Sequence, residues 1–180
     1  EKNIKHVFGY SGGAILPLLD QFYQSDTIKF IKMANESGIG FTAEGYSKSL
    51  CKSKPSVVLT TSGPGVTNMI TPLQNAYSDG SPLVMISAQV PMTSLYTDAF
   101  QECRATNLTF HCTKWNTMIT DPLKVSEAID KAFDIAMEDR KGPVHIDIPK
   151  DILLQQSNIS YKNKGFIKIF NKPHNSTINS

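Results

Sequence analysis

Residues 57–68 read VVLTTSGPGVTN, and the fold of the chain is decided by this stretch. Its first four residues, Val57 to Thr60, are apolar or β-branched without polar alternation, which is typical of a strand buried on both faces. Two glycines and a proline then predict a turn, and an apolar spacing that suits a helix begins at Val66. A short buried strand that turns directly into a helix is the repeating unit of a parallel α/β sheet.

The same alternation of strand and helix continues along the chain. Apolar runs predict strands, and amphipathic spacing predicts helices. The strands are expected at residues 6–9, 28–33, 57–61, 82–88, 114–119 and 144–148, and the helices at 14–23, 36–50, 66–78 and 124–138. We therefore predict an α/β fold of three layers, a six-stranded and mostly parallel sheet with helices on both faces. Residues 1–152 form this domain, and residues 153–180, rich in Asn, Lys and Ser, are interpreted as a linker toward a further domain.

The composition excludes several classes of protein. The chain has 180 residues, 40% of them hydrophobic and 19% charged, with a net charge of +2 from interspersed acids and bases. The sequence shows no basic stripe of the kind that predicts a nucleic-acid partner. No apolar run is long enough to cross a membrane, and the first residues lack a signal-peptide pattern. The three cysteines show no metal-ligand spacing, which indicates free thiols, no metal site in this chain and a reducing compartment. We expect a cytoplasmic protein, or an organellar one if the native chain carries an upstream transit peptide.

A ligand is expected where the strands end, because open parallel sheets bind ligands beyond their carboxyl ends. The glycine loops at 9–13 and 61–68 lie at this edge but match neither GxGxxG nor GxxxxGK[ST]. On pattern alone, each is a plain strand-to-helix turn. The four histidines lie apart in the sequence, so no Ser-His-acid arrangement is predicted.

Glu36 follows the second predicted strand at the start of a helix, in the sequence NESGIGFTAEGY. One interpretation is a helix-cap acid that the helix dipole stabilises by about 0.3–1 kcal/mol, and the pattern alone favours it. The other is a carboxyl group held in a cleft as a proton donor or acceptor. Glu44, eight residues later, is either a surface charge or a group that supports the site.

Seven motifs between Val7 and Ile152 resemble, in order, the N-terminal domain of acetolactate synthase, a family of thiamine-diphosphate-dependent enzymes. They are FGYSGG (8–13), NESGIGFTAEGY (35–46), LTTSGPGVTN (59–68), SDGSPLVMISAQVP (78–91), TDAFQE (97–102), CTKWN (112–116) and GPVHIDIPKD (142–151). TDAFQE and CTKWN point to this family rather than to thiamine-diphosphate enzymes at large. The usual Pro and His of the family are replaced by Ser11 and Asn35, which puts the substrate preference in question.

The resemblance implies a domain that binds the aminopyrimidine ring of thiamine diphosphate. Glu36 then contacts a ring nitrogen and stabilises the imino tautomer, and Gln101 joins it as a catalytic residue near the reacting groups. The other implied cofactor-binding residues are Tyr10, Gly63, Pro64 and Asn68, and the implied substrate-channel residues are Gly13, Ala14, Phe100 and Lys150. On pattern alone, Lys150 is a surface charge after a strand; the family instead has a lysine at the mouth of the channel, where it suits anionic substrates.

The implied reaction, a step of branched-chain amino acid biosynthesis, condenses pyruvate with pyruvate or 2-oxobutyrate and releases CO₂. The implied cofactors are thiamine diphosphate, Mg²⁺ with its ligands in a C-terminal domain beyond this chain, and, in biosynthetic members, FAD. The implied assembly is a homodimer or homotetramer with active sites between subunits and an optional regulatory subunit, so the fragment alone is expected to be inactive. Two alternatives stay open: another thiamine-diphosphate-dependent 2-oxoacid decarboxylase or carboligase, and a non-catalytic, stand-alone dimerising domain.

Overall fold

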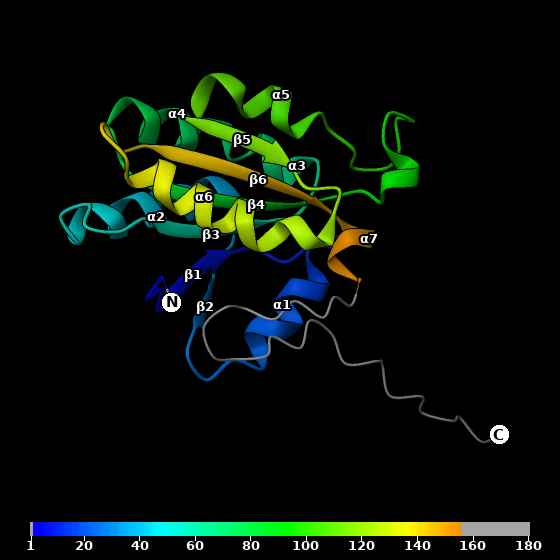
Figure 1. The fold of residues 1–180 in the computed structure, drawn as a ribbon, viewed down its shortest axis with the longest axis horizontal. Coiled ribbons are helices and arrows are strands. Elements are labelled where there is room, and N and C mark those ends of the chain that lie inside the picture. The colour runs from blue at the N-terminus through cyan, green and yellow to red at the C-terminus, as the bar shows by residue number, and fades with distance from the viewer. Residues whose placement is uncertain (1, 156–180) are drawn as a thin grey trace.

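A single six-stranded sheet forms the centre of the computed structural model, which describes residues 2–155 (Figure 1). All neighbouring strands are parallel, in the order β2-β1-β3-β4-β6-β5. Their bounds are β1 (His6–Gly9), β2 (Lys29–Lys32), β3 (Ser56–Thr60), β4 (Leu83–Gln89), β5 (Trp115–Met118) and β6 (Pro143–Pro149). The predicted α/β class and all six strands are confirmed, with the sheet entirely rather than mostly parallel.

Helices cover both faces of the sheet (Figure 1). The first face carries α1 (Leu16–Tyr23), α6 (Val125–Met137) and α7 (Lys150–Leu153), and the second carries α2 (Glu36–Ser49), α3 (Pro64–Thr67), α4 (Ile70–Ser78) and α5 (Ala105–Thr109). Three 3₁₀ helices lie in the connections, η1 (Met92–Ser94), η2 (Phe110–Cys112) and η3 (Pro122–Lys124). The structure thus has the three layers that the sequence predicts.

The central strands are buried on both sides because their alternate residues enter two separate cores. In β3, Val57 and Leu59 pack with the α1 and α6 side of the sheet, whereas Val58 packs with α2 and α4. Fully burying an apolar side chain of this size contributes about 1.5–3 kcal/mol. The edge strands β2 and β5 contain no fully buried residue, so the most buried part of the sheet is its middle.

The single helix predicted for residues 66–78 is wrong, because the chain forms two helices with a break at Asn68 and Met69. Pro72 explains the break: it has no N–H to donate to the carbonyl of Asn68, four residues earlier. That carbonyl accepts a hydrogen bond from Ser37 Oγ instead, at 2.7 Å. The proline therefore leaves the Asn68 carbonyl, between α3 and α4, available to the start of α2.

Helix α7 lies across the predicted domain boundary at residue 152. Its Ile152 and Leu153 are buried in the core next to α1. The predicted linker, 153–180, falls mostly on residues 156–180, outside the described part of the chain. The boundary accordingly stays a prediction.

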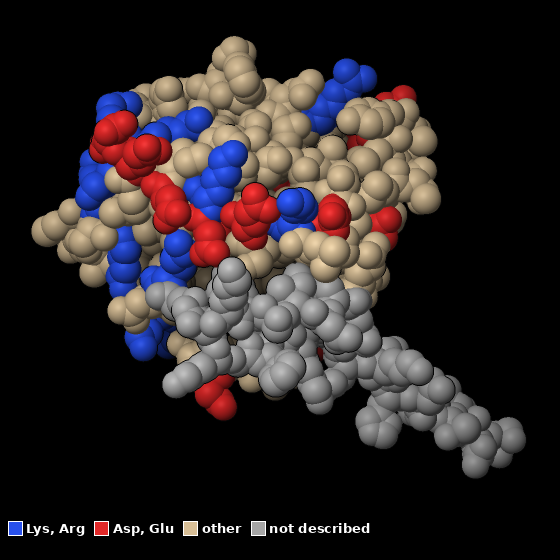
Figure 2. Space-filling model, viewed as in Figure 1, with Lys and Arg blue, Asp and Glu red and all other residues tan. Residues whose placement is uncertain are grey.

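Acidic and basic side chains are interspersed on the face that carries α6 (Figure 2). Lys2 pairs there with Asp130 and Asp134, and Lys124 pairs with Glu127. Across residues 2–155, no helix has the length and apolar character that a membrane span requires.

Candidate active site

The Glu36 carboxyl lies at the carboxyl edge of the sheet, at the first position of α2. Asn35 precedes it as the N-cap, in an extended conformation, and its Oδ1 accepts hydrogen bonds from Ser37 N at 2.8 Å and Gly38 N at 3.3 Å. Glu36 itself is only 7% exposed. An acidic side chain in the first turn of a helix is favourably placed relative to the helix dipole.

Asn68 connects Glu36 to the loop after β3. Its Nδ2 donates a hydrogen bond to Glu36 Oε2 at 3.1 Å, while its backbone carbonyl accepts from Ser37 Oγ. Both bonds depend on the helix break at Asn68, which frees the carbonyl and aims the side chain at α2. The structure thereby brings together two residues that the resemblance assigns to cofactor binding.

Gly63 is the turn between β3 and α3, and Pro64 begins the helix. The φ of Gly63, +54°, lies in the left-handed region, and a Cβ added to Gly63 would come 2.6 Å from the backbone oxygen of Gln101. Only glycine fits both conditions. The structure therefore places Gln101, which itself has a φ of +60°, directly against the turn that the resemblance assigns to the cofactor.

Phe100 and Gln101 belong to an exposed segment, residues 95–104, that follows β4 and η1. The Phe100 side chain is 87% exposed. Glu102 ties the segment together, since its carboxylate accepts backbone N–H bonds from Tyr96, from Thr97 at 3.2 Å and from Ala99 at 3.2 Å. The Tyr96 N–H, followed by that of Ala99, lowers the pKa of the Glu102 carboxyl.

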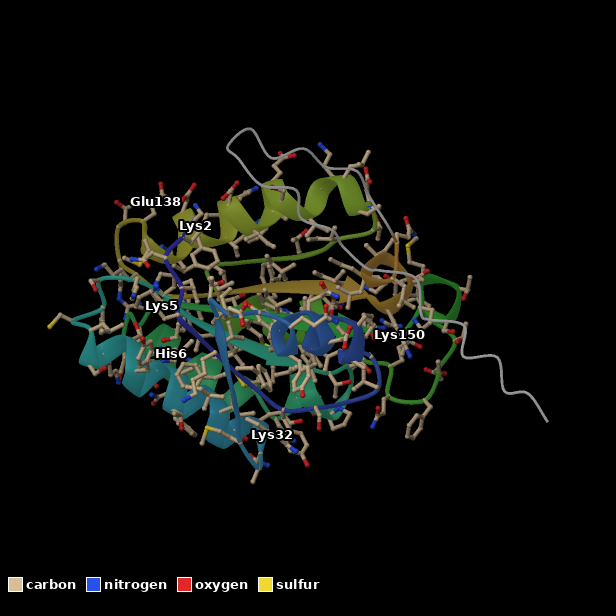
Figure 3. All side chains as sticks on the ribbon, turned by 90° about the horizontal axis from the view of Figure 1, so that it is seen from below. Lys2, Lys5, His6, Lys32, Glu138 and Lys150 are labelled. Carbon is tan, nitrogen blue, oxygen red and sulfur yellow. The ribbon has the colours of Figure 1, made fainter. Side chains whose placement is uncertain are left out.

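The remaining predicted residues surround this edge. Tyr10 is half-buried, with the Lys32 ammonium 6.0 Å from its ring centre. A Cβ on Gly13 would meet open space, and Ala14 packs against the core. Lys150 begins α7, at the end of the molecule away from Lys2 and Glu138 (Figure 3).

Glu44 is a structural acid and not a surface charge, since it is 3% exposed. It accepts hydrogen bonds from Asn75 Nδ2 at 2.6 Å and Ser81 Oγ at 3.1 Å, and it pairs with Lys48 Nζ at 2.9 Å. The bonds join α2 to the end of α4. Glu44 therefore lies in the middle of α2, whereas Glu36 is its first residue.

A chain of buried polar side chains that the sequence did not predict lies between β4 and β6. His145 Nδ1 is 2.9 Å from Thr109 Oγ1, and its Nε2 is 2.7 Å from Ser87 Oγ. Ser87 also bonds to Asp147 Oδ1, and Gln89 Nε2 lies 3.0 Å from Asp147 Oδ2. The signal was present as polar residues at alternate positions of two apolar strands, 87 and 89 in one and 145 and 147 in the other. Only the pairing of Ser87 with Asp147 in the sheet brings them together.

Burial governs the charge of this polar chain. It lowers the pKa of His145 from 6.5 to about 3 and raises that of Asp147 from 3.8 to about 6. Hydrogen bonds from Ser87 and Gln89 oppose the increase at Asp147. A nucleophilic triad is not formed, because the carboxylate bonds to the serine rather than to the imidazole and Ser87 is fully buried.

Comparison with known proteins gives the family of the chain. Residues 1–108 match the family described as thiamine pyrophosphate enzyme, N-terminal TPP binding domain, thiamine pyrophosphate being another name for thiamine diphosphate. The chain belongs to this family.

Individual relatives carry more specific names. The chain is 48% identical over 151 residues to the mitochondrial acetolactate synthase catalytic subunit of Aspergillus candidus and 49% over 150 residues to the mitochondrial acetolactate synthase of Schizosaccharomyces pombe. It is 46% identical over 151 residues to the mitochondrial catalytic subunit of Saccharomyces cerevisiae. Each alignment covers 83% or 84% of this chain and 22% of the relative, so the chain spans about a fifth of the length of these proteins.

The residues at the edge fit the pyrimidine end of thiamine diphosphate. Glu36 offers a buried carboxyl, and the absence of a side chain at Gly63 lets the Gln101 backbone lie against the turn. The hydroxyls of Thr60 and Thr61, at the end of β3, are buried without a hydrogen-bond partner in the described part of the chain. Buried polar atoms of this kind are expected to be satisfied, and a heterocycle with ring nitrogens and an amino group supplies partners of the required chemistry.

Proposed function

We propose that this chain is the pyrimidine-binding domain of an acetolactate synthase catalytic subunit, which joins two 2-oxoacids with loss of CO₂. The observation that carries the proposal is the Glu36 carboxyl, buried at the start of α2 and bonded to Asn68, in a chain whose relatives above are named acetolactate synthases. The bound cofactor supplies the carbanion chemistry, and the protein orients and tunes it.

Each residue of the edge has a distinct part in this proposal. Glu36 holds a proton at a pyrimidine nitrogen, and Asn68 fixes the carboxyl through Oε2 so that Oε1 is left for the ring. Gly63, with Pro64 setting the turn, and the backbone of Tyr10 contact the ring. Phe100 and Gln101 reach the reacting groups.

The substrates are proposed to enter past Gly13 and Ala14, with Lys150 attracting the anionic 2-oxoacids. Asn35 stands where the resembling family usually has a histidine, and in this structure its side chain caps α2. A capping amide supplies no proton at neutral pH. Any proton transfer at this edge is therefore assigned to Glu36 and the cofactor.

Further groups are proposed to complete the enzyme. Among residues 2–155, no cluster of three His, Cys, Asp or Glu side chains could hold a metal ion, and we place the Mg²⁺ ligands in another domain of the full-length protein. A homodimer or homotetramer is proposed, with FAD and a regulatory subunit as optional components. Flavin absorbance of the purified full-length protein, and its mass with and without candidate subunits, would decide these points.

Replacing Glu36 by Gln tests the proposed function. Glu36→Gln keeps the size of the side chain and its bond to Asn68 but removes the group that can hold a proton at the ring. We expect acetolactate formation from pyruvate by the full-length protein, with thiamine diphosphate and Mg²⁺, to fall by about 100-fold or more. The matched control is Glu127→Gln, an exposed acid on α6, which should retain wild-type turnover. A Glu36→Gln variant as active as this control would contradict the assignment.

Product analysis separates the proposed enzyme from a related decarboxylase or carboligase. Pyruvate alone should give acetolactate, and pyruvate with 2-oxobutyrate should also give the mixed product. Free aldehyde as the main product would favour the alternative.

The expectation of a cytoplasmic protein stays a prediction. Because the three relatives above are named as mitochondrial proteins, an organelle is the alternative, and fractionation of the source cells would decide between the two.

A further inference from the structure

We propose that Gln89 is a positioning residue that holds the segment carrying Phe100 and Gln101 against the Gly63 turn. The inference rests on the proposed function for its catalytic consequence, but its structural part can be tested without any turnover. Gln89 is the last residue of β4.

Both polar atoms of the Gln89 side-chain amide form hydrogen bonds. The residue is 1% exposed. Its Oε1 accepts the backbone N–H of Val90 at 2.9 Å, and its Nε2 donates to the carbonyl of Cys103 at 2.9 Å and to Asp147 Oδ2 at 3.0 Å. One side chain thus connects the end of the central sheet to residue 103 of the exposed segment.

The anchor for this connection lies in the buried centre of the sheet. Asp147 lies in β6, opposite Ser87 of β4, and it also accepts a hydrogen bond from the Ser87 hydroxyl. Both strands are buried along their whole length. A hydrogen bond to a buried carboxylate is stronger than one between neutral groups, so Gln89 is held in one orientation from the sheet side.

The segment contacts the Gly63 turn on either side of Glu102. Cys103 Sγ lies 3.9 Å from the Gly63 carbonyl oxygen, and a Cβ added to Gly63 would come 2.6 Å from the Gln101 carbonyl oxygen. The turn at residues 96–99 is held by Glu102 within the segment itself. The bond from Gln89 to Cys103 therefore anchors the end of the segment to the sheet.

Gln89→Met removes this bond with little change in shape, because Met is unbranched, of similar length and apolar. The carbonyl of Cys103 and Asp147 Oδ2 would then each lose a donor, which disfavours the observed position of the segment. Gln74→Met is the matched control, since Gln74 is an exposed residue of α4 whose side chain donates to Ser78 Oγ in the same helix.

The three cysteines report the position of the segment. Cys103 is half-buried and burial raises the pKa of its thiol, Cys112 is buried, and Cys51 is exposed. In the full-length protein we would measure the rate of iodoacetamide alkylation at each thiol by peptide mass spectrometry. In Gln89→Met, Cys103 should react at least about fivefold faster than in the wild type, while Cys51 and Cys112 react at unchanged rates. Gln74→Met should change none of the three rates.

Kinetics test the catalytic consequence in the same variants. A misplaced Phe100 and Gln101 should lower kcat/KM for pyruvate by about tenfold, with the Kd of thiamine diphosphate unchanged within about twofold, since Glu36 and Asn68 are not touched. A wild-type protein that forms no acetolactate would refute the proposed function and leave the alkylation result to decide the positioning.

Three outcomes would overturn the inference. The first is a Cys103 rate in Gln89→Met equal to that of Gln74→Met. The second is a joint increase at Cys103 and Cys112, which would mean general loosening of the domain. The third is faster alkylation of Cys103 with unchanged kcat/KM, which would remove the link to catalysis.

Discussion

Asn35 shows how a single residue decides the position of Glu36. Its side chain caps the first turn of α2 through two backbone amides, Ser37 N and Gly38 N. An uncapped start would leave these amides without partners and would allow the first turn to fray. Because Glu36 is the first residue of that turn, the cap holds the carboxyl where Asn68 can reach it.

Asn35→Ala should lower the free energy of unfolding by about 1 kcal/mol, because alanine cannot accept the two amide hydrogen bonds. Asn35→Asp is the control, since aspartate caps as well as asparagine and should stay within a few tenths of a kcal/mol of the wild type. Urea unfolding of the chain, followed by circular dichroism, would measure both variants. Equal stabilities of the Ala and Asp variants would show that the cap has no energetic role.

At the scale of elements, the contact between α2 and α4 sets the geometry of the edge. Gly40 of α2 faces Pro72 of α4, and a Cβ added to Gly40 would come 2.4 Å from the Pro72 Cβ. The same proline causes the helix break at Asn68. The two helices can therefore approach closely enough for the bonds from Asn68 to Glu36 and from Ser37 to Asn68 to form.

Gly40→Ala should destabilise the domain by about 1–3 kcal/mol, because the added methyl group forces α2 and α4 apart. Gly45→Ala, in the same helix, meets open space and should stabilise it by about 0.5–1 kcal/mol, as alanine favours the helix over glycine. Thermal and urea unfolding would compare the pair. Effects of the same sign in both variants would contradict the close contact with Pro72.

At the scale of the whole molecule, folding shifts a proton from His145 to Asp147, two buried residues of β6. Between about pH 4 and pH 6, the unfolded chain holds it on His145, whose ordinary pKa is 6.5, whereas the folded protein holds it on Asp147, whose pKa is about 6. His145 alone would make the folded state less stable as the pH falls from 6.5 toward 3. Asp147 alone would make it less stable as the pH rises from 3.8 toward 6. The two slopes oppose each other, since each state binds one proton in this window.

Asp147→Asn should expose the contribution of His145. Relative to the wild type, its free energy of unfolding should decrease as the pH falls from 6 to 4, by about 1 kcal/mol per pH unit. His145→Gln should show the opposite slope and lose stability as the pH rises over the same range. Urea unfolding at several pH values, with each variant compared to the wild type, measures both slopes. Parallel profiles for all three proteins would refute the shared proton.

The sequence by itself determined the class of fold and most of its elements. Short apolar runs such as 57–60 predict strands because a strand covered on both faces must be apolar throughout. The helix at 36–50 followed from its amphipathic spacing, and the start of that helix marked Glu36 as a candidate. These features depend on neighbours along the chain, which is why a pattern of residues reveals them.

The tertiary structure alone decided which residues meet. Pro72 breaks a helix and frees a carbonyl for Ser37, Gly63 admits the backbone of Gln101, and the pairing of β4 with β6 aligns Ser87 with Asp147. The bond from Gln89 to Cys103 likewise joins a strand to a segment after it. Most of these contacts join different elements, and their energies depend on distances that only packing sets. The sequence therefore fixes the candidates at the edge, and the folded sheet selects their partners.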